Sequence, residues 1–235
     1  MPDDNSSQRA DRILDAAARL IEHYGYDKTT VSDIAAEAGV SKGAIYLHWK
    51  SKDELFEALL LRESMHVLEE LIQHIEAHPD GGTIFGLFQY GIISIVNNPL
   101  MHALATRDAR VLGDWARRGA NSPMMNEGSM FRKEMVRQLQ AVNVIRSDLD
   151  GDVITYILAL IRYGFLTIHE VYPADQIPPL DAVGKTLAIL LERALAPEGG
   201  GDREAGRQIV INLAQQMRVF LQHWMGTKDK PPTQG

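Results

Sequence analysis

The stretch 30-TVSDIAAEAGVSKGAIYLHWKSK-52 predicts two short helices joined by a tight turn, with a third helix beginning at its end. Thr30 can cap the first helix, and Asp33 three residues later completes a capping box. Gly39 suits the left-handed conformation that ends many helices. Ser41 then caps the second helix. This order of signals is typical of a helix-turn-helix, whose second helix enters the major groove of DNA.

The second helix has an unusual first turn, Lys42, Gly43 and Ala44, which contains no acidic residue. Its free N–H groups and the positive end of its dipole are therefore not neutralised by the protein's own carboxylate. Gly43 and Ala44 are small enough to let the backbone approach a groove wall. Lys42 is suited to hydrogen bonding guanine, and Ala44 to packing against a thymine methyl group.

Lys52 stands at the first position of the following helix, which Ser51 caps and where Glu54 completes a second capping box. A cation at this position opposes the helix dipole. We therefore expect Lys52 to have another partner, for which a DNA phosphate is suitable. A solvated lysine is the alternative.

This motif, with one amphipathic helix upstream, resembles the DNA-binding domain of the tetracycline-repressor (TetR/AcrR) family over about residues 9–56. The resemblance implies phosphate contacts for Thr30, Tyr46, His48 and Lys52, and base contacts for Ser32, Lys42, Gly43 and Ala44. The cap residue Ser41 is included in the predicted DNA-binding set. A helical hairpin without a role in DNA binding is the structural alternative.

The composition is that of a soluble globular protein, with 235 residues, 45% hydrophobic and 23% charged. The N-terminus is polar and acidic, so no signal peptide is expected. The longest apolar run, 153–168, is interrupted by Arg162, so no membrane span is expected. The absence of cysteine excludes disulfides, Cys-ligated zinc and thiol catalysis, and it fits the cytoplasm.

The charge is distributed unevenly along the chain. The net charge is -7, which argues against a broadly basic nucleic-acid coat. Residues 41–52, in contrast, contain three lysines and no acid. A DNA contact surface should therefore be narrow, with strongly salt-dependent affinity.

The periodicity predicts an all-α fold, in which an N-terminal three-helix DNA-binding domain precedes a larger helical domain. The expected domains are residues 1–51 for a tail and the helix-turn-helix, 52–225 for ligand binding and dimerisation, and 226–235 for a flexible tail. The expected helices outside the motif are 8–24, 52–78, 83–97, 99–118, 123–142, 147–172, 180–195 and one after Asp202.

The second domain is expected to enclose a mainly apolar cavity with a few polar groups. Arg162, inside an apolar helix, could anchor an acidic group of a ligand. The alternatives are an ion pair with Asp108 or Glu170, or a charge at a subunit interface. The candidate ligand-binding residues are His66, Tyr90, His102, Trp115, Phe131, Met135, Tyr156, Arg162 and Tyr163, several of which are equally suited to a plain core. The expected effector is an unidentified, largely hydrophobic small molecule.

Catalytic and metal sites are not expected. His74 and His78 have the spacing of a metal pair, but no H-E-x-x-H signature accompanies them. The sequence contains no nucleophile elbow and no phosphate-binding glycine loop, so neither a cofactor nor enzymatic activity is expected.

The family resemblance implies a homodimer formed through about residues 148–172 and 180–195. It further implies a repressor that binds a palindromic operator and is released when a small molecule occupies the second domain. An activator, or a ligand-independent regulator with the same first domain, is the alternative. An enzyme with a vestigial DNA-binding domain is a third, which the missing catalytic motifs disfavour.

Overall fold

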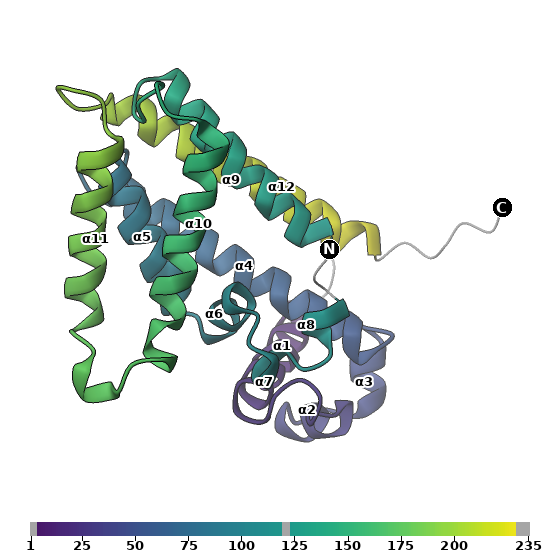
Figure 1. Cartoon of the computed structure of the whole chain (residues 1–235). Coiled ribbons are helices and arrows are strands. Elements are labelled where there is room, and N and C mark those ends of the chain that lie inside the picture. The colour runs from purple at the N-terminus through teal and green to yellow at the C-terminus, as the bar shows by residue number, and fades with distance from the viewer. Residues whose placement is uncertain (1–3, 119–122, 229–235) are drawn as a thin grey trace. The chain divides into compact units, whose positions relative to one another are not determined.

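The computed structural model describes residues 4–118 and 123–228, which are helical throughout apart from turns and loops (Figure 1). No strand occurs in these two ranges, so the all-α prediction is confirmed. The chain divides into two compact units, one within residues 1–65 and 98–120 and the other within 66–97 and 121–235. The predicted boundary at residues 51 and 52 divides the chain by function and stays a prediction.

The first unit is built on the helix-turn-helix. Its helices are α1 (Asp4–Tyr24), α2 (Val31–Glu37), α3 (Lys42–Tyr46) and the first part of α4 (Lys52–Ala77). Large apolar side chains from all four are fully buried: Ile13, Ile21, Ile34, Ile45 and Phe56. Helix α1 begins at Asp4, earlier than the predicted start at residue 8. These helices form the small core that supports α3.

The predicted caps of α2 and α3 are confirmed. The Thr30 hydroxyl accepts from the Asp33 backbone N–H at 3.2 Å, and the Thr30 N–H donates to the Asp33 carboxylate at 2.9 Å. The Ser41 hydroxyl accepts from the Ala44 N–H at 3.2 Å. Gly39 has a φ of 66°, the left-handed conformation expected at the turn. The turn between α2 and α3 is thus determined by local sequence.

The predicted single helix over residues 99–118 is wrong. The segment forms three short helices: α6 (Pro99–Thr106), α7 (Ala109–Leu112) and α8 (Trp115–Arg118). Arg107 ends α6 in the left-handed conformation, with a φ of 56°. The Asp108 carboxylate accepts from the Arg110 N–H at 2.9 Å and caps α7. Gly113 ends α7 with a positive φ of 54°. The left-handed Arg107 and the Asp108 cap therefore separate α6 from α7, and Gly113 separates α7 from α8.

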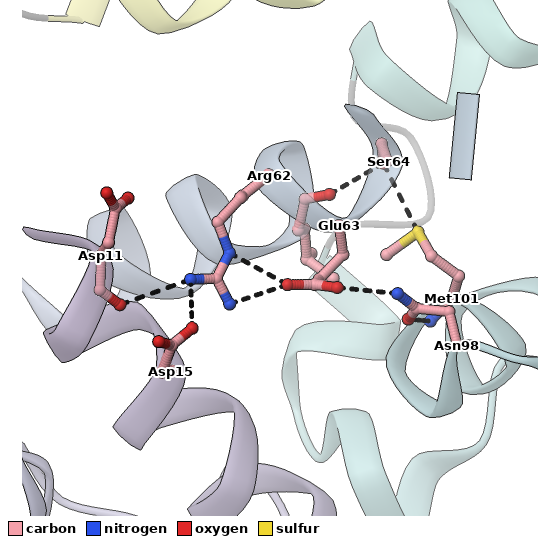
Figure 2. A network of polar contacts seen from close by, with 8 residues as sticks. Asp11, Asp15, Arg62, Glu63, Ser64, Asn98 and Met101 are labelled. Atoms are coloured by element: carbon pink, nitrogen blue, oxygen red, sulfur yellow. Dashed lines mark hydrogen bonds and ion pairs between the residues drawn. The ribbon is translucent and has the colours of Figure 1, made fainter. Parts of the chain in front are cut away.

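A polar network joins α4 to α1 and α6 within the first unit (Figure 2). The Arg62 guanidinium donates to the Asp15 carboxylate at 2.7 Å and to Glu63 at 2.8 Å. Glu63 in turn accepts from the Asn98 amide at 2.7 Å. Asn98 also caps α6 through the Met101 N–H. The arrangement fixes α4 against the helix that supports the DNA-binding motif.

The second unit surrounds a separate apolar core. It comprises the rest of α4 together with α5 (Ile84–Val96), α9 (Pro123–Ala141), α10 (Gly151–Thr167), α11 (Leu180–Leu195) and α12 (Arg203–Lys228), with short 3-10 turns at 168–170 and 174–176. Helix α11 packs on α5, and α9 contacts both α10 and α12 (Figure 1). Buried Ile84, Val136, Leu139, Ile154 and Leu191 meet at the centre of this unit.

Two predicted boundaries in this unit change. The helix expected over 147–172 begins at Gly151, because the Asp150 carboxylate caps it, and continues as a 3-10 turn after Thr167. Helix α12 extends to Lys228, into the predicted 226–235 tail. The remainder of that tail lies outside the described residues.

Helix α12 is attached to the C-terminal end of α4. The Arg207 guanidinium donates to the backbone carbonyls of Glu76 at 3.1 Å and His78 at 3.0 Å, and also to that of Ile75. The Ile75 and Glu76 carbonyls belong to the last turn of α4, where no intrahelical donor is available, whereas the His78 carbonyl, just after the helix, also accepts from the Gly81 N–H at 3.0 Å. A Cβ atom at Gly206 would lie 2.2 Å from the Gly82 carbonyl oxygen. Only a glycine therefore allows this close approach of α12 to the 80–82 turn.

Candidate nucleic-acid interface

Helix α3 is anchored on one side and exposed on the other. Ile45 is 1% exposed and packs into the first unit, whereas Lys42 and Gly43 face solvent. Tyr46 is 51% exposed and Leu47, directly after the helix, is 80% exposed. Large apolar groups held in water at one end of a short helix are suited to contact with another molecule.

The surface at Gly43 is open. A Cβ atom added there would meet only the Ser41 hydroxyl, at 3.7 Å, which is an ordinary van der Waals contact. Gly43 also has no positive φ, unlike Gly39 in the turn before α3. The fold itself therefore does not require glycine at position 43. The missing side chain leaves the α3 backbone accessible to a close-fitting partner.

Lys52 has partners inside the protein. Its ammonium group donates to the carbonyl oxygens of Tyr26 at 2.7 Å and Thr29 at 3.0 Å, and lies 3.9 Å from the centre of the Tyr26 ring. The Tyr26 hydroxyl donates to Asp53. The expectation that this cation has another partner is met, but by backbone carbonyls. A phosphate contact of Lys52 stays a prediction and no longer follows from the position of the charge.

The second unit contains a cavity of about 300 Å³ between its part of α4 and helices α5, α9 and α10. Most of its wall is apolar, with Leu87, Phe88, Leu139 and Leu158 among the lining residues. Polar groups are few and include the guanidinium groups of Arg132 and Arg162. This combination is typical of a small-molecule site.

Comparison with known proteins places this geometry in a family. The family model described as "Bacterial regulatory proteins, tetR family" matches residues 13–59, which contain the whole helix-turn-helix. The HTH-type transcriptional repressor Rv1474c of Mycobacterium tuberculosis is 28% identical over 177 residues, covering 70% of this chain and 83% of the relative. The chain belongs to the tetR family of bacterial regulatory proteins.

Further relatives of this tetR-family chain agree. The HTH-type transcriptional regulator TtgR of Pseudomonas putida is 32% identical over 101 residues, which is 43% of this chain and 47% of TtgR. The fatty acid degradation regulator FadR from Bacillus halodurans has the same fold, with a TM-score of 0.58, 20% identity and coverage of 78% of this chain and 94% of FadR. The chain is accordingly a DNA-binding transcriptional regulator.

The predicted DNA-binding residues of this tetR-family chain all lie in the first unit. Thr30, Ser41, Lys42, Gly43 and Tyr46 are exposed. Four others are less so: Ser32, Ala44, His48 and Lys52 are intermediate in exposure. The His48 ring lies 5.3 Å from that of Trp49. All nine residues therefore belong to one compact unit, while their individual contacts with DNA stay predictions.

Leu47 is a candidate that the sequence analysis missed. It is the most exposed large apolar residue of the described chain. Its signal in the sequence is its position three residues after Ala44, which places both on the same side of a helix. That side is the one opposite the buried Ile45, so an apolar residue there cannot serve the core.

The predicted ligand-binding residues separate into three groups. Phe131, Met135 and Arg162 line the cavity. His66, Tyr90, Tyr156 and Tyr163 belong to the second unit but do not line it, and His102 and Trp115 belong to the first unit.

The residues outside the cavity have other surroundings. Trp115 is buried against Phe56, with ring centres 5.4 Å apart, and is a core residue of the first unit. The Tyr90 hydroxyl donates to Asp80 at 2.8 Å, and its ring stacks on those of His74 and His78. Burial, followed by the Asp80 carboxylate, raises the pKa of Tyr90 to about 12. The Tyr90 hydroxyl is thus hydrogen-bonded within the protein, and Trp115 packs in a core.

The ion pair with Asp108 suggested for Arg162 does not form. Asp108, one suggested ion-pair partner, is bonded to Arg110, whose guanidinium lies 2.8 Å from its carboxylate. That guanidinium holds the pKa of the Asp108 carboxyl below its usual value. Arg162 instead faces the cavity.

Helix α10 exposes a row of apolar side chains. Val153, Tyr156, Ile157, Leu160 and Tyr163 are each about half exposed or more. The segment Gly151–Glu170 is long and apolar enough to cross a membrane by length and composition, with a mean hydropathy of 1.4. An apolar helix face of this kind is equally typical of an interface between subunits.

The two histidines with metal-pair spacing, His74 and His78, lie at the end of α4. No group of three or more His, Asp or Glu side chains in residues 4–118 and 123–228 is arranged to hold a metal ion. His74 and His78 are stacked, with ring centres 5.9 Å apart, and His74 lies 3.8 Å from the Glu70 carboxylate.

Proposed function

We propose that this tetR-family regulator is a cytoplasmic repressor that binds a two-fold symmetric operator as a homodimer and leaves it when a small molecule occupies the cavity. The observation that supports it best is the open face of α3. Lys42 and Gly43 face solvent there, next to the exposed Tyr46 and Leu47. A protein that used this helix only as a structural element would not keep large apolar groups in water.

Dimerisation is supported by the apolar surface of the last core helices. The predicted interface segments, 148–172 and 180–195, contain α10 and α11 with their exposed apolar side chains. Leu160 is 55% exposed and Leu190 is 57% exposed. A dimer would bury these groups and would present two copies of α3 to successive turns of the major groove.

Release by a ligand is supported by the cavity and by the relatives. One structure of the same fold, FadR from Bacillus subtilis, was solved in complex with stearoyl-CoA, and it covers 77% of this chain at 20% identity with a TM-score of 0.57. A ligand that fits one conformation of the dimer better than the DNA-binding one shifts the population away from the operator.

Repression is favoured over activation by the names of relatives. Rv1474c is named a transcriptional repressor, and IcaR of Staphylococcus epidermidis, 30% identical over 80 residues, a negative transcriptional regulator. Transcription in vitro from the chain's own operator separates the two functions. A transcript level that rises on adding the protein would overturn repression and leave the activator.

The experiment that tests DNA recognition is selection of purified protein against random duplex DNA, followed by sequencing of the retained fraction. We expect a two-fold symmetric site with half-sites about one helical turn apart. The Lys42→Ala chain is the matched comparison, and it should retain DNA with a relaxed sequence preference. If the unaltered chain enriches no sequence at low salt, α3 is not a DNA reader and the proposal fails.

A further inference from the structure

The cavity of the second unit has a charged region within an apolar wall. Arg132 of α9 and Arg162 of α10 both line it. Burial lowers the pKa of each guanidinium, and the positive charge of Arg132 lowers the pKa of Arg162 further. Two groups of like charge therefore share a poorly solvated space.

No protein carboxylate compensates these charges among the described residues. Ion pairs there are formed by other arginines, such as Arg137 with Glu134 on the same helix α9, but not by Arg132 or Arg162. Both arginines are partly buried, and cations withdrawn from water are normally paired, because removing them from water is costly. An unpaired pair of guanidinium groups in a cavity is the arrangement that an anion from outside would complete.

A buried hydroxyl points to the same occupant. Ser94 of α5 lines the cavity, is 0% exposed, and has no hydrogen-bond partner in the described part of the chain. Thr155 lines the same cavity, yet its hydroxyl donates to the Gly151 carbonyl at 2.8 Å, as hydroxyl groups in helices commonly do. A buried polar group without a partner is rare and calls for a ligand or a water molecule.

We propose that the cavity binds an apolar carboxylic acid, whose carboxylate pairs with Arg132 and Arg162 and whose hydrocarbon part lies along the apolar wall. Guanidinium groups bind carboxylates through paired, charge-assisted hydrogen bonds. Leu87, Phe88 and Leu158 provide the apolar surface. The cavity volume of about 300 Å³ is at the lower end for ligand sites, which favours a slender chain over a large ring system. This inference rests on the proposed function, since it gives the chemical class of the effector.

The test is a calorimetric titration of the full chain, without DNA, using three probes with one tail and different head groups. Dodecanoate should bind about 10- to 100-fold more tightly than dodecanol, because only the acid gains charge-assisted hydrogen bonds. Dodecyltrimethylammonium should not bind, because its cation would meet two others. Equal binding of the acid and the alcohol would overturn the proposal.

Variants assign the head group to the two arginines. Arg162→Ala and Arg132→Ala should each weaken dodecanoate about 10-fold or more and leave dodecanol unchanged. Arg137→Ala is the matched control, because it removes the same charge from an exposed site on α9; it should change neither probe. Weakening of both probes by the cavity variants would indicate a structural role and contradict the proposal.

Arg162→Lys covers the case in which an alanine variant does not fold. It keeps the charge but loses the planar fork, so dodecanoate should bind with intermediate affinity. Binding of dodecanoate at the unaltered level would overturn the assignment of Arg162.

A parallel measurement of operator affinity, with and without dodecanoate, separates this inference from the proposed function. Specific operator binding together with no calorimetric binding of the acid leaves the DNA-binding function intact and overturns the inference. Calorimetric binding without any change in operator affinity confirms the ligand class and overturns release by that ligand.

Discussion

A methyl group added at Gly43 separates the requirements of the fold from those of DNA binding. The new Cβ atom would lie 3.7 Å from the Ser41 hydroxyl and would meet no other atom within 4 Å. The backbone there is helical, where alanine is favoured over glycine by roughly 0.5–1 kcal/mol. Because the position is in the first turn, we expect Gly43→Ala to raise the free energy of unfolding by about 0.5 kcal/mol.

The same methyl group should weaken operator binding. If α3 lies in the major groove with its first turn against the DNA, the added carbon enters a close contact. An extra methyl in a well-packed contact costs about 1–3 kcal/mol. Since 1.4 kcal/mol corresponds to about tenfold in affinity, Gly43→Ala should weaken operator binding about 10- to 100-fold.

Gly39→Ala is the matched control in the same motif. A Cβ atom at Gly39 would meet no atom within 4 Å, but the φ of 66° is left-handed. This conformation costs an L-residue about 1–2 kcal/mol. Gly39→Ala should therefore lower the free energy of unfolding by that amount, while the folded molecules bind the operator as before.

The assays are urea unfolding followed by circular dichroism and operator binding followed by fluorescence anisotropy. Binding is measured at one salt concentration and at a temperature at which all three chains are folded, because affinity for DNA depends strongly on salt. A Gly43→Ala chain that is less stable than the unaltered one, or that binds the operator equally well, would refute the assignment of this face to DNA.

Three further predictions concern contacts away from this face. Lys52→Met removes two hydrogen bonds to carbonyl oxygens and should lower the free energy of unfolding, measured by urea unfolding, by about 2 kcal/mol. Unchanged stability, together with a salt slope of operator binding reduced by about 1, would instead indicate a phosphate contact. The Thr30 hydroxyl and N–H hold the pKa of the Asp33 carboxyl below its usual 3.8. The ionised carboxylate therefore stabilises the folded protein fully above pH 3.8, and this contribution is lost as the pH falls through the lowered pKa. Asp33→Asn should therefore unfold more readily at pH 7 and show a shallower loss of stability below about pH 4, and acid profiles of equal steepness would contradict this. Arg207→Ala should lower stability by about 2 kcal/mol because it removes the side-chain donor of the Ile75 and Glu76 carbonyls in the last turn of α4, whereas Arg203→Ala, at an exposed position, should change it little.

The DNA-binding motif was predictable because its signals are local. The Thr30 cap, the Ser41 cap and the left-handed Gly39 each act within three or four residues of the chain. Such groups adopt the same geometry wherever the surrounding helices permit it.

The error over residues 99–118 has a physical reason of the same kind. Asp108 begins α7 and Gly113 ends it, so both helix signals were present in the sequence. The left-handed conformation of Arg107 was not, because only a few per cent of residues other than glycine adopt it.

The candidate cavity could be predicted only in part, because its polar residues meet through tertiary packing. Arg162 stood out as a charge in an apolar helix, whereas Arg132 occupies a helix with many charged residues, and nothing local distinguishes it from the exposed Arg137. Lys52 illustrates the converse case: its unfavourable position in the helix dipole indicated a partner, but the partners are carbonyls 23 and 26 residues earlier in the chain. A cation in an unfavourable place thus indicates that a partner exists. Whether that partner is backbone, nucleic acid or ligand depends on which groups the fold brings to it, and for Arg132 and Arg162 the fold brings a second cation and an unpaired hydroxyl, which leaves the anion to be supplied from outside.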